Sequence, residues 1–181
     1  MTVPPIRIPS GRPQAGEFGA YAEPDVEHVV GDDAVAALAA QVQLALDLFA
    51  AITENFASTF VYAPGKWNLK QVVGHMIDDE RIFAYRALCL ARSDARPLPG
   101  FDEKDYVQFA GFETRRWEDL LTEYRIVRDA TLALFSTFSP EAWLRRGNVN
   151  GYDASVRGLA FHLAGHELHH LRLVRERYLG A

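Results

Sequence analysis

The sequence has a single cysteine, Cys89, so its 181 residues cannot form an internal disulfide. It has no uninterrupted run of about 18 apolar residues, and we therefore expect no transmembrane helix. It also lacks a basic excess: 19 Lys and Arg face 24 Asp and Glu, which argues against a nucleic-acid-binding surface. Residues 1–14 are polar and proline-rich, unlike a secretory signal. We expect a cytoplasmic protein whose partners are neither nucleic acids nor membranes.

Apolar residues make up 49% of the chain, which is enough for one domain with a sizeable core. Five of the nine prolines fall within residues 1–31, so this segment is expected to be an irregular lead-in. Residues 32–181 are expected to form the folded domain, with Cys89 as a buried structural thiol inside it.

Apolar side chains recur at three- and four-residue spacing through most of this domain, which is the period of an amphipathic helix. The spacing predicts four long helices, at residues 34–58, 69–92, 114–137 and 155–180. Shorter elements are expected between them: a helical piece at residues 103–110, a turn opened by Ser139 and Pro140, and a small hairpin within residues 147–152. Four long amphipathic helices predict an all-α four-helix bundle.

Histidines are concentrated near the C-terminus, where four of the six fall within ten consecutive residues: His162, His166, His169 and His170. In a helix each residue turns about 100°, so His162, His166 and His170 form one stripe, with His169 beside it. Neutral imidazole is the commonest metal ligand in proteins, and residues four apart on a helix can direct two ring nitrogens to one ion. The stretch therefore predicts a metal site.

Two histidines leave a metal ion short of ligands, and His75 is the only histidine outside the cluster that falls in a predicted core helix. A three-histidine shell with water in the remaining positions is typical of catalytic zinc. We expect a divalent ion, zinc or nickel first, with iron, cobalt and manganese as alternatives. Asp79, one turn after His75, is expected either to hydrogen-bond and orient a ligand histidine, with His75 the better placed by helical rotation, or to be a solvated or capping carboxylate.

Residues 166–170 also match the H-E-x-x-H motif of zinc proteases. Those proteases usually take a third ligand from further along the chain, but only eleven residues follow His170. The next carboxylate, Glu176, lies about 9 Å further along the same predicted helix, too far to reach the same ion. A protease site is therefore not expected.

Four motifs occur in order along the chain: residues 62–67 (YAPGKW), 74–81 (GHMIDDER), 97–102 (PLPGFD) and 165–170 (GHELHH). Together they resemble the DinB-like superfamily, over about residues 33–178. The resemblance implies a four-helix bundle in which His75, His166 and His170 hold a divalent metal. The family pattern has a non-ligating histidine at position 169, and His162 lies outside the pattern, so both are expected to line the site or support the ligands.

The resemblance also implies a range of functions. Similar members include S-transferases and isomerases that use low-molecular-weight thiols such as bacillithiol or mycothiol, and others are labelled metal-dependent hydrolases. We expect a metal-dependent transferase that uses a low-molecular-weight thiol and a small-molecule substrate. A metal-dependent hydrolase and a non-catalytic metal-binding or stress-associated protein are the alternatives. A homodimer is a further family-level expectation.

Overall fold

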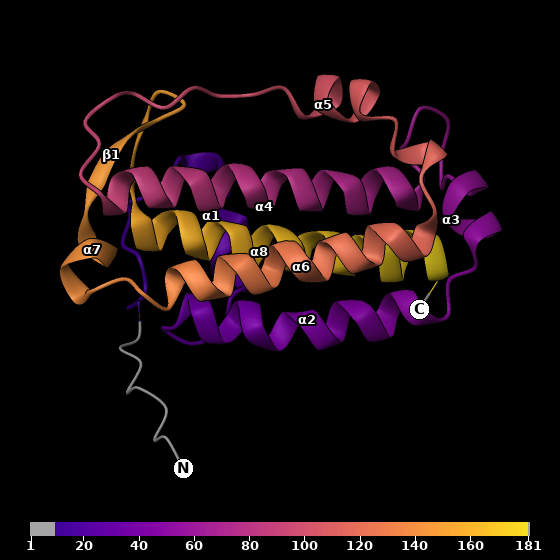
Figure 1. The fold of residues 1–181 in the computed structure, drawn as a ribbon, viewed down its shortest axis with the longest axis horizontal. Coiled ribbons are helices and arrows are strands. Elements are labelled where there is room, and N and C mark those ends of the chain that lie inside the picture. The colour runs from indigo at the N-terminus through magenta and orange to yellow at the C-terminus, as the bar shows by residue number, and fades with distance from the viewer. Residues whose placement is uncertain (1–9, 181) are drawn as a thin grey trace, which may run out of the picture.

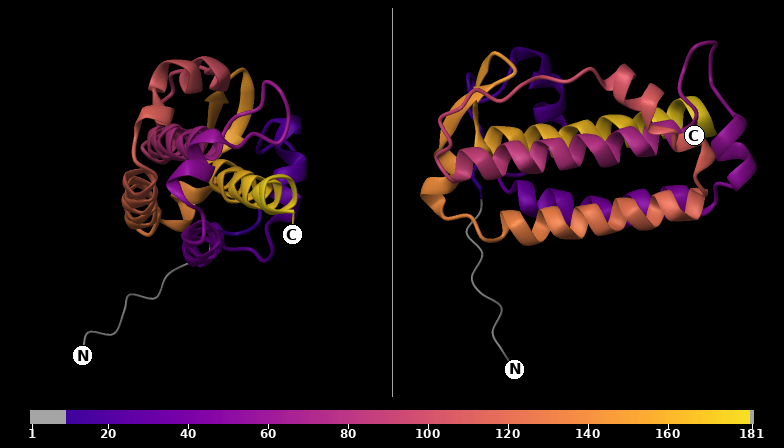
Figure 2. Two further views of the ribbon diagram at one scale, coloured as in Figure 1. Left: turned by 90° about the vertical axis from the view of Figure 1, so that its right-hand side faces the viewer. Right: turned by 45° about the horizontal axis from the view of Figure 1, so that its top comes forward.

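The computed structural model describes residues 10–180, and four long helices run side by side along its length (Figures 1 and 2). They are α2 (Ala34–Ala50), α4 (Leu69–Ala91), α6 (Trp117–Phe135) and α8 (Val156–Leu173). Helix α4 packs against α6 and α8, and α2 packs against the same two helices from the other side. The predicted all-α four-helix bundle is confirmed. Within residues 10–180, no helix combines the length and apolar character needed to cross a membrane.

The predicted helix at residues 34–58 is divided in two, which corrects the sequence-based expectation. Helix α2 ends at Ala50, and a short helix, α3 (Glu54–Thr59), follows it. Thr53 separates them, because its backbone is extended and its side-chain oxygen accepts a hydrogen bond from Phe56 N, as an N-cap does. The apolar spacing continues from Ile52 to Phe56 through this break, so periodicity alone did not reveal it.

The other long helices differ from expectation only near their ends. Helix α4 starts with a capping box between Asn68 and Gln71, in which each side chain bonds the other's backbone N–H. Two short elements precede α6, namely α5 (Glu103–Ala110) and the 3-10 turn η2 (Phe112–Thr114). Helix α8 continues into a π-helical segment, η3 (Val174–Leu179), which ends at Gly180 with a positive φ of 68°.

A hairpin closes one end of the bundle, where it follows the short helix α7 (Pro140–Leu144) (Figure 1). Its strands β1 (Arg146–Val149) and β2 (Tyr152–Ser155) pair antiparallel. Asn150 and Gly151 join them with positive φ angles of 54° and 82°, as a tight two-residue hairpin turn requires. Backbone hydrogen bonds from the hairpin hold Leu98, which fixes the loop that leads over α4 to α5.

The N-terminal lead-in is less irregular than predicted. Residues 10–31 contain a 3-10 turn, η1 (Ala20–Ala22), and a short helix, α1 (Glu23–His28), that packs on α8. Gly165 makes this close packing feasible, because a side chain there would collide with the backbone of Asp25. The segment is thus docked on the bundle and brings Tyr21 and Asp25 to the surface of α8. Residues 1–9 of the predicted lead-in lie outside the described part of the chain.

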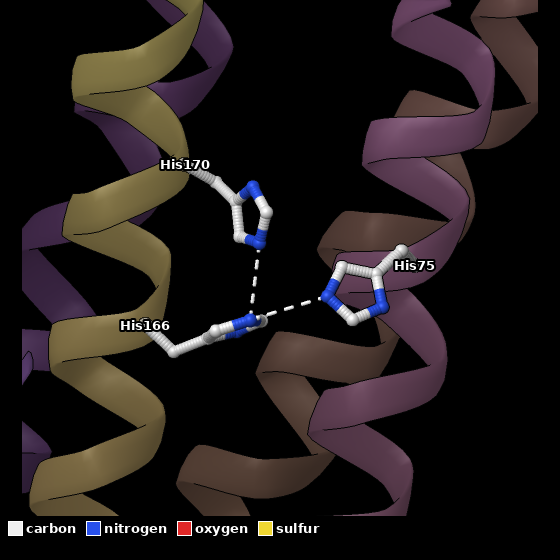
Figure 3. Close-up of side chains that lie close together, drawn as sticks. All are labelled: His75, His166 and His170. Carbon is white, nitrogen blue, oxygen red and sulfur yellow. Dashed lines mark hydrogen bonds between the residues drawn. The ribbon is translucent and has the colours of Figure 1, made fainter. Parts of the chain in front are cut away.

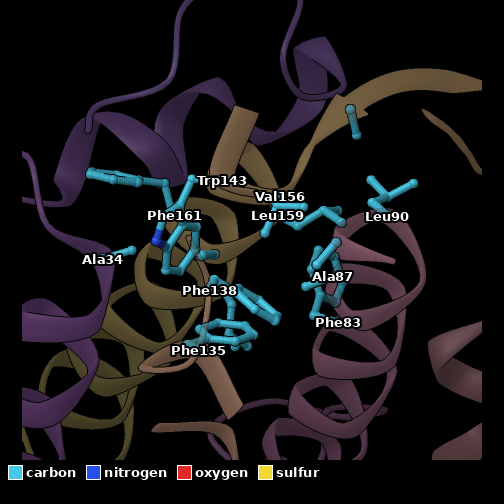
Figure 4. Packing of buried hydrophobic residues seen from close by; sticks show 14 of the residues in the cluster. Ala34, Phe83, Ala87, Leu90, Phe135, Phe138, Trp143, Val156, Leu159 and Phe161 are labelled. Carbon is cyan, nitrogen blue, oxygen red and sulfur yellow. The ribbon is translucent and has the colours of Figure 1, made fainter. Parts of the chain in front are cut away.

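The bundle interior has two apolar clusters with a charged layer between them. One cluster, near the hairpin, includes Phe83, Phe135 and Phe161 (Figure 4), and the other includes Phe49 and Trp117. Between them, along the helices, lies a buried guanidinium with two buried carboxylates: Arg128, Glu80 and Glu167. Arg128 of α6 also donates to Leu38 O of α2 at 3.0 Å, so this one side chain joins all four helices.

Candidate metal centre

Three histidines from two helices meet at one face of the bundle (Figure 3). His75 comes from α4, and His166 and His170 come from successive turns of α8. Their Nε2 atoms converge: His166 Nε2 lies 3.2 Å from His75 Nε2 and 3.0 Å from His170 Nε2. One ligand nitrogen from each ring lies within 4.8 Å of the others. The structure thus brings together the three residues that the sequence predicted as ligands.

The chemical state of these rings suits a divalent metal. Burial lowers the pKa of His75, and burial together with repulsion from the neighbouring imidazoles lowers the pKa of His166 and His170 far below the usual value. All three are therefore neutral at pH 7, the form that binds metals. Ligand nitrogens on one tetrahedral zinc lie about 3.3 Å apart. The separations of 3.2 and 3.0 Å from His166 Nε2 to the other two Nε2 atoms are close to that value. The site fits such an ion, and metal binding by these residues stays a prediction.

Asp79 contacts a different histidine from the one that the sequence suggested. Its Oδ2 lies 3.2 Å from Nδ1 of His166, across the interface between α4 and α8. Burial raises the pKa of Asp79 to about 6, so the group is mostly ionised at pH 7. A carboxylate there favours the tautomer with the proton on Nδ1, which leaves the Nε2 lone pair of His166 facing the other two histidines. The positions of residues around α4 indicated His75 as the partner of Asp79. They could not reveal His166, because it belongs to another helix.

The remaining two histidines of the cluster stay outside the group of three. His162 Nε2 lies 3.5 Å from Asp25 Oδ2, and its ring packs edge-on against Phe83. Burial would raise the pKa of Asp25, but the hydrogen bond and charge of His162, together with the nearby His166 and His169, lower it. The His169 ring lies 5.3 Å from that of His170, and His169 borders a cavity that His75, His166 and His170 also border. These positions agree with the expected lining roles, which stay predictions.

Two adjoining cavities open onto the histidines. One, of about 370 Å³, is bordered by His75, His166 and His170, and the other, of about 400 Å³, is bordered by His162 and His166. Elements from across the chain contribute their walls: Tyr21, Asp25, Trp67, Arg86, Phe101 and Glu103. The Trp67 ring lies 5.1 Å from that of His75 and forms part of the wall of the first cavity. There is room for a small molecule beside the three histidines.

Sequence reasoning missed several of these wall residues. Tyr21 and Asp25 were assigned to an irregular lead-in, and no local pattern connects them with α8. Glu103 carries its carboxylate Oε2 to 4.0 Å from His75 Nε2, although it starts a short helix far along the chain. One available signal was the motif at residues 97–102, which directly precedes Glu103 but does not give the conformation of the loop.

Glu167, the acidic residue of the H-E-x-x-H motif, lies away from the three histidines. It is 2% exposed, hydrogen-bonds the Tyr124 hydroxyl and pairs with Arg128, with Oε2 2.5 Å from Nη2. Burial raises the pKa of Glu167, and Arg128 opposes that rise. A zinc protease needs this carboxylate beside the metal as a general base. The location of Glu167 therefore agrees with the expectation that the site is not a protease site.

Comparisons with known proteins point to one family. The sequence model of a family described as the DinB superfamily matches residues 59–174, more than half of the chain. Among solved structures, YfiT from Bacillus subtilis is similar, with a TM-score of 0.66, 16% sequence identity and 91% of each chain covered. YfiT is described as a probable metal-dependent hydrolase with an unusual four-helix bundle topology. At that identity the likeness shows a shared fold. No curated protein matches this sequence.

Proposed function

The chain belongs to the DinB superfamily, and from that premise we propose that it is a metal-dependent enzyme that transfers a low-molecular-weight thiol to a small-molecule acceptor. One observation carries the proposal: the neutral imidazoles of His75, His166 and His170 converge at the wall of an open cavity. Within residues 10–180, no cysteine or carboxylate has a ligand atom within 4.8 Å of all three histidine nitrogens. Three protein ligands leave coordination positions for a cosubstrate, as in catalytic rather than structural sites.

In this proposal, several residues of the site and of the cavity walls have distinct roles. His75, His166 and His170 hold the ion, which we expect to be zinc or nickel, and Asp79 keeps His166 in the ligand tautomer. The ion, when bound, lowers the pKa of the group in its open position, a thiol here or water in a hydrolase. The Trp67 ring shields one side of the site from water. Arg86 and Lys104, which border the second cavity, attract a thiolate.

Hydrolysis is the second candidate, and the position of Glu103 favours it. Its carboxylate faces both cavities and lies 4.0 Å from His75 Nε2, where it can accept a proton from an attacking water molecule. The description of the structurally similar YfiT points in the same direction. A third alternative is a non-catalytic site in which the ion only links α4 to α8 and stabilises the fold.

A conjugation assay separates these alternatives. The metal-loaded protein is incubated with a chromogenic electrophile and a panel of low-molecular-weight thiols, and in parallel with a panel of esters and amides. We expect thiol conjugation above the uncatalysed rate with at least one thiol, lost on chelation and in His170→Ala. The matched control, His28→Ala, removes an exposed histidine that contacts Arg172 and lines neither cavity, and this variant should keep the activity.

Three outcomes contradict the thiol proposal or replace it. If every thiol reacts at the uncatalysed rate, thiol transfer is wrong. If the esters or amides are cleaved instead and Glu103→Gln abolishes the cleavage, the protein is a hydrolase. If nothing reacts but the metal raises the melting temperature, the site is structural. Gel filtration tests the expected homodimer independently.

A further inference from the structure

Arg86, on α4, is a buried cation without a carboxylate partner. It is 4% exposed, and its Nη2 donates to Pro99 O at 2.7 Å. The rings of Phe83 and Phe101 lie 5.1 and 5.6 Å from its guanidinium carbon. Within residues 10–180, Pro99 O is its only hydrogen-bond acceptor, and no carboxylate oxygen lies within 4.0 Å of it. A buried guanidinium normally has a paired charge, so an unpaired one indicates a missing anion.

Arg86 borders the cavity that His166 also borders. Arg86, His162 and His166 line the same space of about 400 Å³, and Lys104 lies at its rim. The aromatic contacts hold the guanidinium plane in place, while its remaining N–H groups stay available. A molecule that reaches His166 through this cavity therefore passes within reach of a fixed, planar cation.

The carboxylates around the same cavity are already engaged with other groups. Asp25 pairs with His162, Asp102 caps α5 by accepting from Lys104 N and Asp105 N, and Glu103 faces His75. Asp79 contacts His166. Asp79 attracts Arg86 at longer range, but none of these carboxylates lies within ion-pair distance of it. Their negative charge also disfavours a dianionic phosphate at this position, whereas a single carboxylate matches the guanidinium in charge and in planar geometry.

We propose that Arg86 binds a carboxylate group of the small molecule that enters the cavity, so that the site selects acidic substrates or acidic thiols. This inference rests on the proposed function in one respect only, namely that the molecule bound by Arg86 also reaches the three histidines. It names the substrate class: a small molecule with a carboxylate at one end and the reacting group at the other. Arg86 is thus a specificity-determining residue.

The test uses two thiols that differ in one group, 3-mercaptopropionate and 3-mercapto-1-propanol. Dissociation constants are measured with the cobalt-loaded protein through the sulfur-to-metal absorption band, and with the metal-free protein through ligand-observed NMR. We expect wild type to bind the carboxylate thiol at least roughly tenfold more tightly, since a charge-assisted hydrogen bond is worth more than a neutral one. Arg86→Met should remove this preference, and Arg86→Lys should keep part of it.

Arg81→Met is the matched control, because Arg81 lies on the same helix but pairs with Glu123 on the surface. It should keep the wild-type preference. Circular dichroism verifies that each variant is folded, and Arg86→Lys covers the case in which Arg86→Met does not fold. Inorganic phosphate, added as a competitor, should displace 3-mercaptopropionate no better than acetate does.

The outcomes separate this inference from the proposed function. Equal affinity for the two thiols in wild type, or an unchanged preference in both Arg86 variants, overturns the carboxylate site but leaves thiol chemistry intact. An absent cobalt band together with carboxylate binding that depends on Arg86 overturns thiol binding at the metal and supports this site. Stronger competition by phosphate than by acetate would overturn the assignment to a carboxylate.

Discussion

Arg128 Nη2 donates a hydrogen bond to Glu167 Oε2 at 2.5 Å inside the bundle. Glu167 directly follows His166, a residue of the candidate metal centre, in the sequence. Adjacent residues of one helix thus serve two different purposes, because successive side chains on a helix point about 100° apart. Glu167 belongs to the charged layer that joins the helices, and His166 belongs to the cavity. Mutations at the two positions should therefore have separable effects.

Replacing Glu167 should affect stability rather than metal binding. Glu167→Gln is expected to lower the free energy of unfolding by about 2 kcal/mol, the typical contribution of a hydrogen bond to a charged group. The double variant Glu80→Gln/Glu167→Gln should lose about 4 kcal/mol, since it leaves Arg128 buried without a counter-charge. Urea denaturation gives these values. A Glu167→Gln protein with wild-type stability and no activity would instead restore Glu167 as a catalytic base.

Removing His75 should abolish metal binding without unfolding the bundle. His75→Ala deletes one of three ligands, and the metal content, measured by mass spectrometry after dialysis, is expected to fall from about one equivalent to nearly none. Far-UV circular dichroism should remain that of the wild type. His28→Ala is the control, since His28 is exposed. Unchanged metal content in His75→Ala would remove this residue from the metal site.

Asp79→Asn tests the contact with His166. Without the carboxylate, His166 loses the group that favours its ligand tautomer, and metal affinity should fall by roughly 10- to 100-fold. Competition with a chromogenic chelator measures the change. Asp78→Asn is the neighbouring control, because Asp78 faces Arg81 and lies outside the metal centre. Equal affinities of the two variants would contradict a supporting role for Asp79.

The metal-free protein should lose stability as the pH falls below about 6.5. Unfolded histidines titrate near that value, whereas burial lowers the pKa of His75, His166 and His170 in the folded state. The unfolded chain then binds more protons, so the free energy of unfolding decreases with decreasing pH. The carboxylates whose pKa values burial raises, namely Asp79 (to about 6), Asp78 and Glu167, act in the opposite direction at lower pH. The histidines titrate first as the pH falls, because their pKa values in the unfolded chain are the highest.

Urea denaturation after dialysis against a chelator, at several values between about pH 7.5 and about pH 5.5, measures this dependence. The comparison is His166→Ala/His170→Ala, which lacks two of the three groups and should show a shallower decline. Parallel curves for the two proteins would mean that these histidines do not determine the pH dependence.

The sequence by itself determined what depends on neighbours along the chain. The four-residue spacing placed His166 and His170 on one face of a helix, and apolar periodicity placed the helix of His75 at residues 69–92, against Leu69–Ala91 in the structure. Both follow from helix geometry, which is local. The break at Thr53 is local as well, but it depends on a capping hydrogen bond that competes with an unbroken apolar period.

Tertiary structure alone decided which side chains face one another across helices. The partner of Asp79, the burial of Glu167 against Arg128, and the approach of Asp25 to His162 all join residues far apart in the sequence. So does the cavity shared by Arg86 and His166. These relationships depend on which faces of the helices pack together and on how the helices are shifted relative to one another along the bundle axis. The packing of the whole core sets both. The three histidines that meet could therefore be predicted from the sequence, while the cavities beside them could not.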